Sequence, residues 1–481
     1  MLPCPMLRLR RGWGRQLAAV TGVGFIIRIV YVLAFKRGVP LVGDGHYYAG
    51  AADLLPKHGF IQPDQFIYSH GRVSTPAADH PPAYIVVLAL WSWLGAQSTL
   101  IFQLWSALLG TVTVAVVGLT GRRIAGPRVG LVAAVLAAVY PNFWINEALV
   151  MSETLTLLLS AAVIWAAYKL WQRHTTPAAA VLGLAIGGFV LTRAEGLLLP
   201  VLLVVPLCLA MKPLDWKSRL RLLLVAEIVV VACLTPWVAF NLSRFDRPEL
   251  VTTGLGFAMH TANCDTAYRG PLNGYWAYPC GGGLFKGDHS DLDVAQRKLA
   301  MTYIGEHVGQ LPGVSIARLG RTWGFFRPAQ QLRLDQKESG RDLPAAWAGL
   351  LMYWAMIPVS VAGALILRRR SVPLVPLLAM PFIVSIAVLL TFGQTRYRAP
   401  AEVSLVLLTA VAADSLWSGR HTATGLQEQF ARKRPRNVDD PETLARLLGV
   451  LADSDGGEKP PELASPTAKS ETTSPARSTL G

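Results

Sequence analysis

Long apolar runs constrain the fold of this chain more than any other feature of its sequence. Several runs of roughly 16 to 22 residues carry almost no charge, which is the length that a helix needs to cross a lipid bilayer. Of the 481 residues, 52% are apolar and 16% are charged, whereas a soluble domain carries about a quarter charged residues. The sequence therefore predicts an all-α polytopic membrane protein. It excludes a soluble dehydrogenase, a nucleic-acid-binding domain and a secreted disulfide scaffold.

The net charge of +15 comes from 45 Lys and Arg residues against 30 Asp and Glu residues. In a soluble protein such an excess would indicate nucleic-acid binding. Here the basic residues stand mostly at the ends of apolar runs, where they orient the spans and contact anionic headgroups. We therefore expect membrane lipids, and no nucleic acid, among the partners.

We expect about ten transmembrane helices after a cytoplasmic N-terminus over residues 1–16. No clear small-residue cleavage site follows the first run, so we interpret it as a retained helix rather than a signal peptide. The segment 83–96 is too short to cross, because its fourteen residues reach only ~21 Å in a helix against a hydrocarbon core of ~30 Å. We interpret it as an interfacial helix. The expected spans are 17–35, 100–120, 130–146, 154–171, 178–192, 196–211, 221–240, 346–367, 374–391 and 401–417.

The distribution of Lys and Arg tests this topology. With ten spans, all basic clusters of the connecting segments fall on one side of the membrane, as the positive-inside rule requires. If 83–96 crossed, every cluster after the first would change side. We therefore predict a multi-pass protein of the plasma membrane with both termini in the cytoplasm. The cytoplasmic clusters are Arg122/Arg123/Arg128, Lys169/Arg173, Lys212/Lys217/Arg219 and Arg368/Arg369/Arg370.

Two large segments then lie outside the cytoplasm, residues 36–99 and 241–345, within a transmembrane domain over 17–417. The tail 418–481 is rich in Arg, Asp, Glu, Pro, Ser and Thr. We expect this tail to be cytoplasmic and largely disordered, with a short helix over 441–451.

Two of the five cysteines, Cys264 and Cys280, lie in the second outer segment. A disulfide between them would form in an oxidising compartment and, by closing a loop of about 16 residues, would stabilise the segment by ~3 kcal/mol. The alternative is two free thiols.

An acid between two glycines follows the first span, in the run 42–48 (VGDGHYY). The carboxylate of Asp44 can accept a proton or orient a hydroxyl beside a group carried by a lipid. The alternative is structural, because Asp and Gly also form turns and cap helices.

Other polar side chains gather at the outer ends of the spans. His80 precedes Pro81 and Pro82 at the start of the short helix, where it can donate to a phosphate or merely belong to a helix start. Glu153 stands at the edge of a span, aimed either into a cavity or at the interface. Arg193 and Glu195 share a short outer connection and can pair with each other.

Arginines next to aromatic residues end the second outer segment and form the last outer turn. Guanidinium groups bind phosphate bidentately while aromatic rings rest at headgroup depth, so these arginines fit a lipid phosphate. Headgroup anchoring is the alternative. The arginines are Arg321, Arg327, Arg396 and Arg398.

The sequence contains no Walker-A loop, no His-Glu-x-x-His and no Cys-x-x-Cys motif. The run Asp291-Leu292-Asp293 mimics the Asp-x-Asp of nucleotide-sugar enzymes, but with Ser290 before it we interpret it as a capping box. Arg28 and Glu227 lie within spans, where they are functional candidates; the alternatives are a snorkelling arginine or an internal ion pair.

Taken in order, these segments resemble the GT-C class of membrane glycosyltransferases, and within it family 39, which contains protein O-mannosyltransferases and the lipid A aminoarabinose transferase. The resemblance covers roughly residues 15–415. It departs from the family at two positions: Gly45 stands where a second acid is often found, and His80 where some relatives carry the basic residue that contacts the donor phosphate. The motifs that match are Asp44 after the first span, His80-Pro81-Pro82-Ala83-Tyr84, Ser152-Glu153, Leu191-Thr192-Arg193 and Arg396-Tyr397-Arg398-Ala399-Pro400.

The segment Asn263–Cys280 with Arg321-Thr322-Trp323 further resembles actinobacterial members of the family. The resemblance implies a polyprenyl-phosphate-linked sugar as donor and a hydroxyl of an unidentified protein, lipid or glycan as acceptor, with no cofactor and no metal. Such a donor already has a good leaving group, so the transfer needs one base and cations around the departing phosphate.

On this hypothesis Asp44 is the base of an inverting transfer and Glu153 orients the acceptor or Asp44. The donor phosphate would be held by His80, Arg321, Arg327, Arg396 and Arg398, with Tyr47, Tyr84, Arg193 and Glu195 as supporting residues. The alternative from another class is a transporter or flippase for a polyprenyl-linked or anionic substrate, which would use the charged residues within the spans.

Overall fold

The computed structural model describes residues 6–63, 75–281 and 287–432. Within these ranges the chain is helical and contains no β-strand, only an isolated bridge between Ile61 and Pro76. The predicted all-α class is therefore confirmed. The chain divides into two units, Met1–Ser418 and Gly419–Gly481, and the polar site discussed below lies entirely in the first.

The helices follow the apolar runs of the sequence. Their bounds are α1 Met6–Tyr31, η1 Val32–Lys36, α2 Asp44–His58, α3 Ala83–Trp93, α4 Thr99–Ala125, α5 Pro127–Val139, α6 Pro141–Trp144, α7 Glu153–Arg173, α8 Thr176–Val190, η3 Ala194–Leu198, η4 Pro200–Val204, α9 Val205–Leu209, α10 Trp216–Leu242, α11 Leu255–Ala262, α12 Asp265–Tyr268, η5 Gly270–Leu272, η6 Tyr278–Gly281, α13 His289–Glu306, η7 Val308–Gln310, α14 Leu311–Thr322, α15 Pro328–Ser339, α16 Leu343–Arg369, α17 Val375–Leu390, η8 Thr395–Arg398 and α18 Ala399–Arg432.

Six helices of the described residues are long and apolar enough to cross a membrane, which identifies a multi-pass membrane protein. They are Gly12–Lys36, Thr99–Ala125, Glu153–Arg173, Trp216–Leu242, Leu343–Arg369 and Thr395–Trp417. The other expected spans coincide with shorter apolar helices, so the number of ten spans stays a prediction. These shorter helices are Pro127–Val139, Thr176–Val190, Pro200–Leu209 and Val375–Leu390.

The segment 83–96, expected to be too short to cross the membrane, forms the short helix α3. Pro82 caps its start, and Gly95, with a φ of 78°, follows its end. Its 11 residues rise only ~16 Å, which is too little to cross the hydrocarbon core. The helix is thus as short as expected, and its position at the interface stays a prediction.

The last helix, α18, continues to Arg432, beyond the expected end of the span at 417. The remainder of the expected disordered tail, including the helix expected over 441–451, lies outside the described residues.

Small residues allow the first long helices to pack closely. Gly126, with a φ of 103°, ends α4, and Pro127 begins α5, so the two helices form a tight hairpin. A Cβ at Gly130 would meet the backbone oxygen of Gly118, so the helices approach too closely for a side chain there. This hairpin forms much of the wall against which α1 packs.

Arg28, the charged residue within the first span, belongs to an internal ion pair. Arg28 donates from Nε to Glu147 at 2.9 Å and from Nη1 to the backbone oxygen of Gly24 at 3.1 Å. Both side chains of the pair are buried. Arg28 therefore holds α1 against the turn that follows α6, the structural alternative considered for this residue.

The basic connecting segments meet at one end of the helix bundle. The guanidinium of Arg122 stacks on Trp13 at 4.2 Å, and Arg123 donates to Gln172 at 2.9 Å. The hydroxyl of Tyr168 donates to the backbone oxygen of Pro373 at 2.7 Å. These contacts join three of the connections that the positive-inside rule assigns to the cytoplasm.

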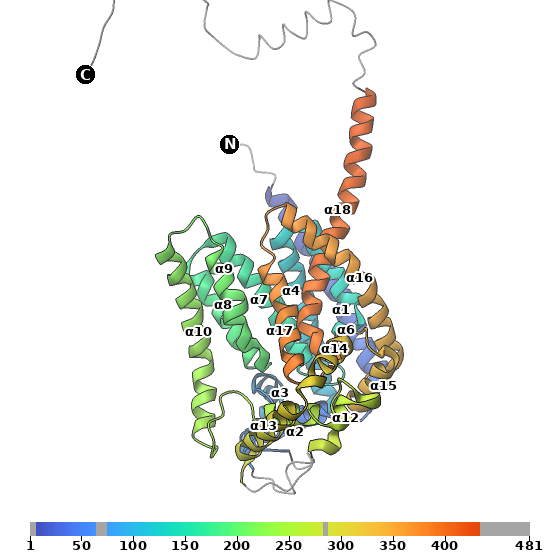
Figure 1. The fold of residues 1–481 in the computed structure, drawn as a ribbon. Helices are drawn as coiled ribbons and strands as arrows, with labels where there is room; N and C mark the ends of the chain where they lie inside the picture. The colour runs from blue at the N-terminus through green and yellow to red at the C-terminus, as the bar shows by residue number, and fades with distance from the viewer. Residues whose placement is uncertain (1–5, 64–74, 282–286, 433–481) are drawn as a thin grey trace, which may run out of the picture. The chain divides into compact units, whose positions relative to one another are not determined.

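The two large connecting segments fold into short helices. Figure 1 shows α2, α3, α12 and α13 gathered at one end of the bundle of long helices. The segment after the first span contributes α2 and α3, and the segment after α10 contributes α11 to α15.

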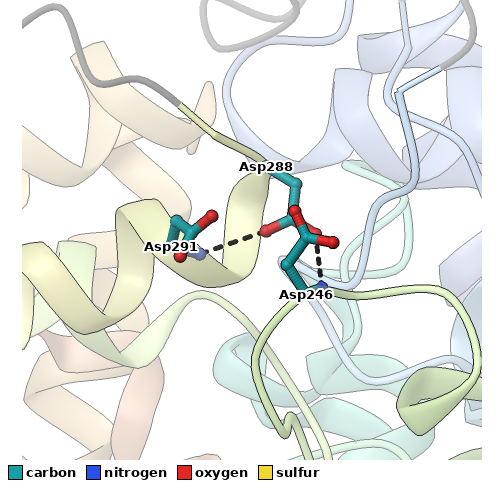
Figure 2. Close-up of side chains that lie close together, drawn as sticks. All are labelled: Asp246, Asp288 and Asp291. Carbon is teal, nitrogen blue, oxygen red and sulfur yellow. Dashed lines mark hydrogen bonds between the residues drawn. The ribbon is translucent and has the colours of Figure 1, made fainter.

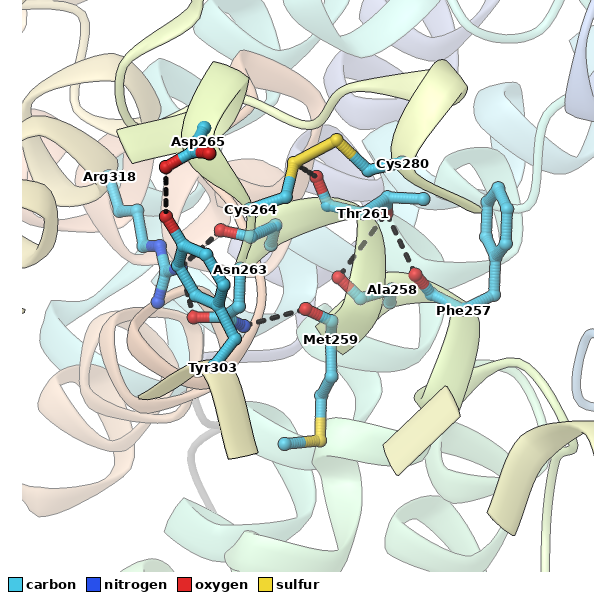
Figure 3. The surroundings of a disulfide bond; sticks show 11 residues. Phe257, Ala258, Met259, Thr261, Asn263, Cys264, Asp265, Cys280, Tyr303 and Arg318 are labelled. Atoms are coloured by element: carbon cyan, nitrogen blue, oxygen red, sulfur yellow. Dashed lines mark hydrogen bonds between the residues drawn. A yellow bond between two sulfur atoms is a disulfide. The ribbon is translucent and has the colours of Figure 1, made fainter. Parts of the chain in front are cut away.

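The predicted disulfide between Cys264 and Cys280 is present, with 16 residues of separation and Cα atoms 6.4 Å apart (Figure 3). Beside it Asn263 accepts from Arg318 Nη2 at 2.9 Å and donates to the backbone oxygen of Met259 at 2.6 Å. The disulfide therefore ties α11 and α12 to the turn at η6, and Arg318 attaches this part to α14.

Candidate active site

Asp44 is the first residue of α2, and the backbone packs tightly on both sides of it. Gly43 has a φ of 55°, and a Cβ there would overlap the backbone oxygen of Glu338. A Cβ at Gly45 would overlap the backbone oxygen of Leu149. The absence of a second acid at position 45 is thus explained by packing, because any side chain there would collide with the chain before α7.

The carboxylate of Asp44 is bound by an arginine from the last outer turn. Arg396 Nη1, in η8, donates to Asp44 Oδ2 at 2.6 Å, and His80 Nε2 lies 3.9 Å from Asp44 Oδ1. Burial alone would raise the pKa of Asp44, but Arg396, His80 and Arg193 outweigh it and lower the pKa from 3.8 to about 2. Asp44 is therefore ionised at every physiological pH.

His80 stands against two aromatic rings of α2. Its ring lies 4.8 Å from that of Tyr47 and 4.9 Å from that of Tyr48. Burial lowers the pKa of His80 below 6.5, and the opposing effects of Asp44 and Asp79 do not restore it. His80 is therefore mostly neutral at pH 7 and acts there as a hydrogen-bonding group rather than as a cation.

Glu153 begins α7 and is buried, with a side chain only 1% exposed. Arg193 Nη1 lies 3.7 Å and Arg396 Nε 4.0 Å from its Oε1. Among the described residues, neither carboxylate oxygen of Glu153 has a hydrogen-bond partner. Two buried acceptors between two guanidinium groups are therefore available to a hydroxyl donor.

Arg193 and Glu195 pair with each other, as the sequence allowed, with Arg193 Nε 2.8 Å from Glu195 Oε1. Arg193 has two further contacts: it faces Glu153, and its guanidinium lies over the ring of Tyr397 at 4.9 Å. The same ring lies 5.3 Å from the guanidinium of Arg396. Tyr397 is therefore the spacer between the two arginines.

Glu338, near the end of α15, is a further carboxylate that the sequence analysis missed. Its Oε2 accepts from Trp276 Nε1 at 3.1 Å and also from Tyr275 and Gln394. Its Oε1 lies 3.9 Å from Arg396 Nη2. No local pattern in a polar helix distinguishes this acid; only the tertiary fold brings it to Arg396.

We call these residues the Asp44 cluster: Asp44, His80, Glu153, Arg193, Glu195, Glu338 and Arg396. They come from the start of α2, the entrance of α3, the start of α7, the connection after α8, the end of α15 and η8.

The other arginines expected to hold a phosphate have other partners. Arg321 donates to the backbone oxygens of Asn273 at 2.6 Å and Pro271 at 2.7 Å, and to the side chain of Gln331 at 3.0 Å. Arg327 is exposed and donates to the backbone oxygen of Gly270 at 2.9 Å. Both therefore fasten the second outer segment.

Arg398 is only two residues from Arg396 but faces elsewhere. Its Nε donates to Glu402 at 2.5 Å, and its guanidinium stacks on Tyr353 at 4.0 Å. Because η8 is a single turn, these two arginines take different directions: one reaches Asp44 and the other locks α18 to α16.

The two supporting tyrosines lie beside the cluster rather than in it. Tyr84 in α3 is buried and hydrogen-bonds Ser106 at 2.8 Å. Tyr47 packs against the imidazole ring of His80. These contacts are consistent with indirect support from both tyrosines, through the walls of the site.

Three aspartates of the second outer segment lie close together without forming a comparable site (Figure 2). Asp288 caps α13, accepting from the backbone nitrogens of Ser290 at 2.8 Å and Asp291 at 3.1 Å, and Asp291 pairs with Arg247 at 2.8 Å. The predicted capping box was therefore wrong in its residues: the cap is Asp288, not Ser290. The carboxylates have structural partners, and Asp246 is exposed.

The fold is similar to that of solved membrane glycosyltransferases. The oligosaccharyltransferase AglB from Archaeoglobus fulgidus, in complex with an inhibitory peptide and a dolichol-phosphate, superimposes with a TM-score of 0.53 at 15% identity, over 90% of this chain and 54% of that chain. Its apo form gives 0.52 at 14% identity, over 91% and 54%. The chain thus spans about half the length of these structures. ArnT from Cupriavidus metallidurans bound to undecaprenyl phosphate gives 0.40 at 17% identity, over 88% and 81%.

The sequence comparison finds one family model that matches part of the chain. Residues 79–240 match the family model described as dolichyl-phosphate-mannose-protein mannosyltransferase, whereas no curated protein matches the chain. The match agrees with the resemblance to family 39 over this segment, and the actinobacterial type stays a prediction. The matched segment contains His80, Glu153 and Arg193; Asp44, Glu338 and Arg396 lie outside it.

Proposed function

We propose that this chain is a glycosyltransferase that moves a sugar from a polyprenyl-phosphate donor to a hydroxyl acceptor at the extracytoplasmic membrane face. One observation carries the proposal: Asp44 and Glu153, from segments far apart in the sequence, both lie within 4.0 Å of the guanidinium of Arg396. The description of the family model and the dolichol-phosphate bound to AglB support the donor class.

The proposed reaction is a single displacement. The acceptor hydroxyl gives its proton to Asp44, and its oxygen attacks the anomeric carbon of the sugar from the face opposite the phosphate. The bond from that carbon to the phosphate oxygen breaks, and its electron pair leaves with the polyprenyl phosphate. A phosphate is a good leaving group, so no general acid is required, unlike in glycoside hydrolysis. One displacement inverts the configuration, and no metal enters any of these steps.

The charge of each residue in the Asp44 cluster suggests its part in the transfer. Arg396 and Arg193 are the cations available to the departing phosphate, and His80, mostly neutral, is suited to donate a hydrogen bond to it. Glu153 offers two buried acceptors to the acceptor hydroxyl. Arg321, Arg327 and Arg398 have structural partners. We therefore no longer assign them to the donor phosphate, so fewer residues hold the phosphate than the sequence suggested.

The proposed sidedness follows from charge and redox chemistry. The basic connections at the opposite end would face the cytoplasm, together with both termini, and the membrane would be the plasma membrane. The disulfide between Cys264 and Cys280 supports an oxidising environment for the second outer segment, which contributes Glu338 to the cluster.

The test is transfer of a labelled sugar from a synthetic polyprenyl-phosphate donor by the purified full-length protein. Asp44→Asn keeps the size of the side chain and removes the base, so we expect activity to fall at least about 100-fold. Asp246→Asn, the same change at an exposed acid, serves as the matched control and should leave activity unchanged. Full activity of a normally expressed Asp44→Asn variant would remove Asp44 from the mechanism. Movement of the lipid across vesicles without transfer would favour the flippase.

A further inference from the structure

We propose that Glu338 is a positioning residue: it is the second anchor of the Arg396 guanidinium, which moves toward it when a donor phosphate enters and so releases Asp44. This inference rests on the proposed function, and it assigns a role to an acid outside the motifs of the sequence. Glu338 contacts neither the sugar nor the acceptor in this scheme and acts through Arg396.

The carboxylate of Glu338 is held with one oxygen directed at Arg396. Oε2 is fixed by donors from Tyr275, Trp276 and Gln394, which come from two different segments. Oε1 faces Arg396 Nη2 at 3.9 Å, beyond hydrogen-bond distance. Glu338 is therefore oriented to bind the guanidinium of Arg396, which lies close by but is bound to Asp44 in this structure.

Arg396 is attached so that it can exchange these two carboxylates. Its Nε donates to Gln394 Oε1 at 2.8 Å, while Nη1 reaches Asp44 at 2.6 Å. Gln394 in turn donates from Nε2 to Glu338 and to Tyr275. With Nε held by Gln394, a small rotation of the guanidinium lengthens the contact with Asp44 and closes the contact with Glu338.

The exchange is needed because Asp44 is a poor base while Arg396 is bound to it. A general base works best when its pKa is near the working pH, whereas Arg396, His80 and Arg193 hold the pKa of Asp44 at about 2 against the effect of burial. When Arg396 leaves, the largest of the lowering effects is removed and burial is opposed only by His80 and Arg193, so the proton affinity of Asp44 rises. Burial likewise raises the pKa of Glu338, and Arg396, Tyr275 and Gln394 oppose it.

The charges of the Asp44 cluster explain why the phosphate triggers the exchange. The four carboxylates outnumber the two guanidinium groups, and His80 is mostly neutral. An entering phosphate adds negative charge beside Asp44 and competes for Arg396. Glu338 keeps the displaced guanidinium next to the phosphate, so that Arg396 is not pulled back to Asp44.

The test uses undecaprenyl phosphate as the probe and the carboxyl reagent dicyclohexylcarbodiimide, which modifies protonated carboxyl groups. Labelling of Asp44 is followed by peptide mass spectrometry across pH, with and without the probe. In the unaltered protein we expect the probe to raise the midpoint of labelling by about one pH unit or more, a tenfold gain in proton affinity. In Glu338→Gln we expect this shift to be lost, although the probe still binds.

Glu306→Gln, the same change at an exposed acid of α13, is the control and should keep the full shift. Glu338→Asp retains the charge and should restore part of the shift, which a merely structural role would not produce. A full shift in a folded Glu338→Gln variant that binds the probe would overturn the inference, as would the absence of any shift in the unaltered protein.

The labelling needs only binding of the phosphate, so it separates this inference from the proposed function. A protein that shows the Glu338-dependent shift but transfers no sugar would refute the glycosyltransferase and support the role of Glu338. A protein that transfers sugar but shows the full shift of the labelling midpoint in Glu338→Gln would support the glycosyltransferase and refute the role of Glu338.

Discussion

Replacement of Arg396 by Gln tests how strongly the Asp44 cluster depends on one guanidinium. Asp44 has a pKa of about 2 in place of 3.8, because Arg396, His80 and Arg193 overcome burial. At 1.36 kcal/mol per unit, a difference of about two units corresponds to roughly 2–3 kcal/mol of stability. Because the pKa is lowered on folding, this stability is present above pH 4 and is lost as the pH falls toward 2.

Without Arg396, the largest of the lowering effects is removed and burial is opposed only by His80 and Arg193, so the pKa of Asp44 rises and most of this contribution is lost at pH 7 as well. Glu153 and Glu338 also lose the guanidinium that faces them. Removing one partner of a buried ion pair costs about 3–5 kcal/mol, and we expect Arg396→Gln to reach the lower end of this range because the Asp44 side chain is 24% exposed.

A double-mutant cycle isolates the pair. Free energies of unfolding are measured by tryptophan fluorescence in mixed detergent micelles for the unaltered protein, Asp44→Asn, Arg396→Gln and the double variant. We expect a coupling of about 2 kcal/mol at pH 7 that shrinks as the pH approaches the pKa of Asp44. A coupling below about 0.5 kcal/mol at pH 7, or one that does not change with pH, would refute the reasoning.

Three further predictions concern the frame of the site. Replacing Cys264 and Cys280 by Ser should destabilise the second outer segment by about 3 kcal/mol, seen as a lower thermal midpoint that no longer responds to reductant; an unchanged midpoint would contradict it. Gly45→Ala should reduce the yield of folded protein in size-exclusion chromatography, because its Cβ overlaps a backbone oxygen, whereas Gly305→Ala, in open space, should not; equal yields would argue against the packing. Arg28→Met should cost about 3–5 kcal/mol in unfolding experiments, since it leaves a buried carboxylate unpaired, and a neutral effect would count against that ion pair.

The sequence predicted the helices well because the bilayer imposes a length on apolar segments, and a run such as that of α4 satisfies it without tertiary information. It also singled out Asp44 and Glu153, which stand at the starts of helices next to apolar runs and which the structure places beside the same guanidinium; their roles stay a prediction. The disulfide followed from the placement of only two cysteines in one outer segment.

The sequence could not rank the arginines or find Glu338. Arg321, Arg396 and Arg398 share aromatic neighbours in the sequence, but their partners depend on distances across the fold: backbone oxygens for Arg321, Glu402 for Arg398 and Asp44 for Arg396. The acid near the end of α15 lies almost 300 residues from Asp44 in the chain and has no local motif.

The most direct test of the account is an experimental structure of the protein with undecaprenyl phosphate bound. The account predicts the phosphate group within hydrogen-bond distance, about 3 Å, of Arg396 and beside Asp44 and His80. A phosphate bound instead at Arg321 or Arg327, with the contact between Arg396 and Asp44 unchanged, would contradict it.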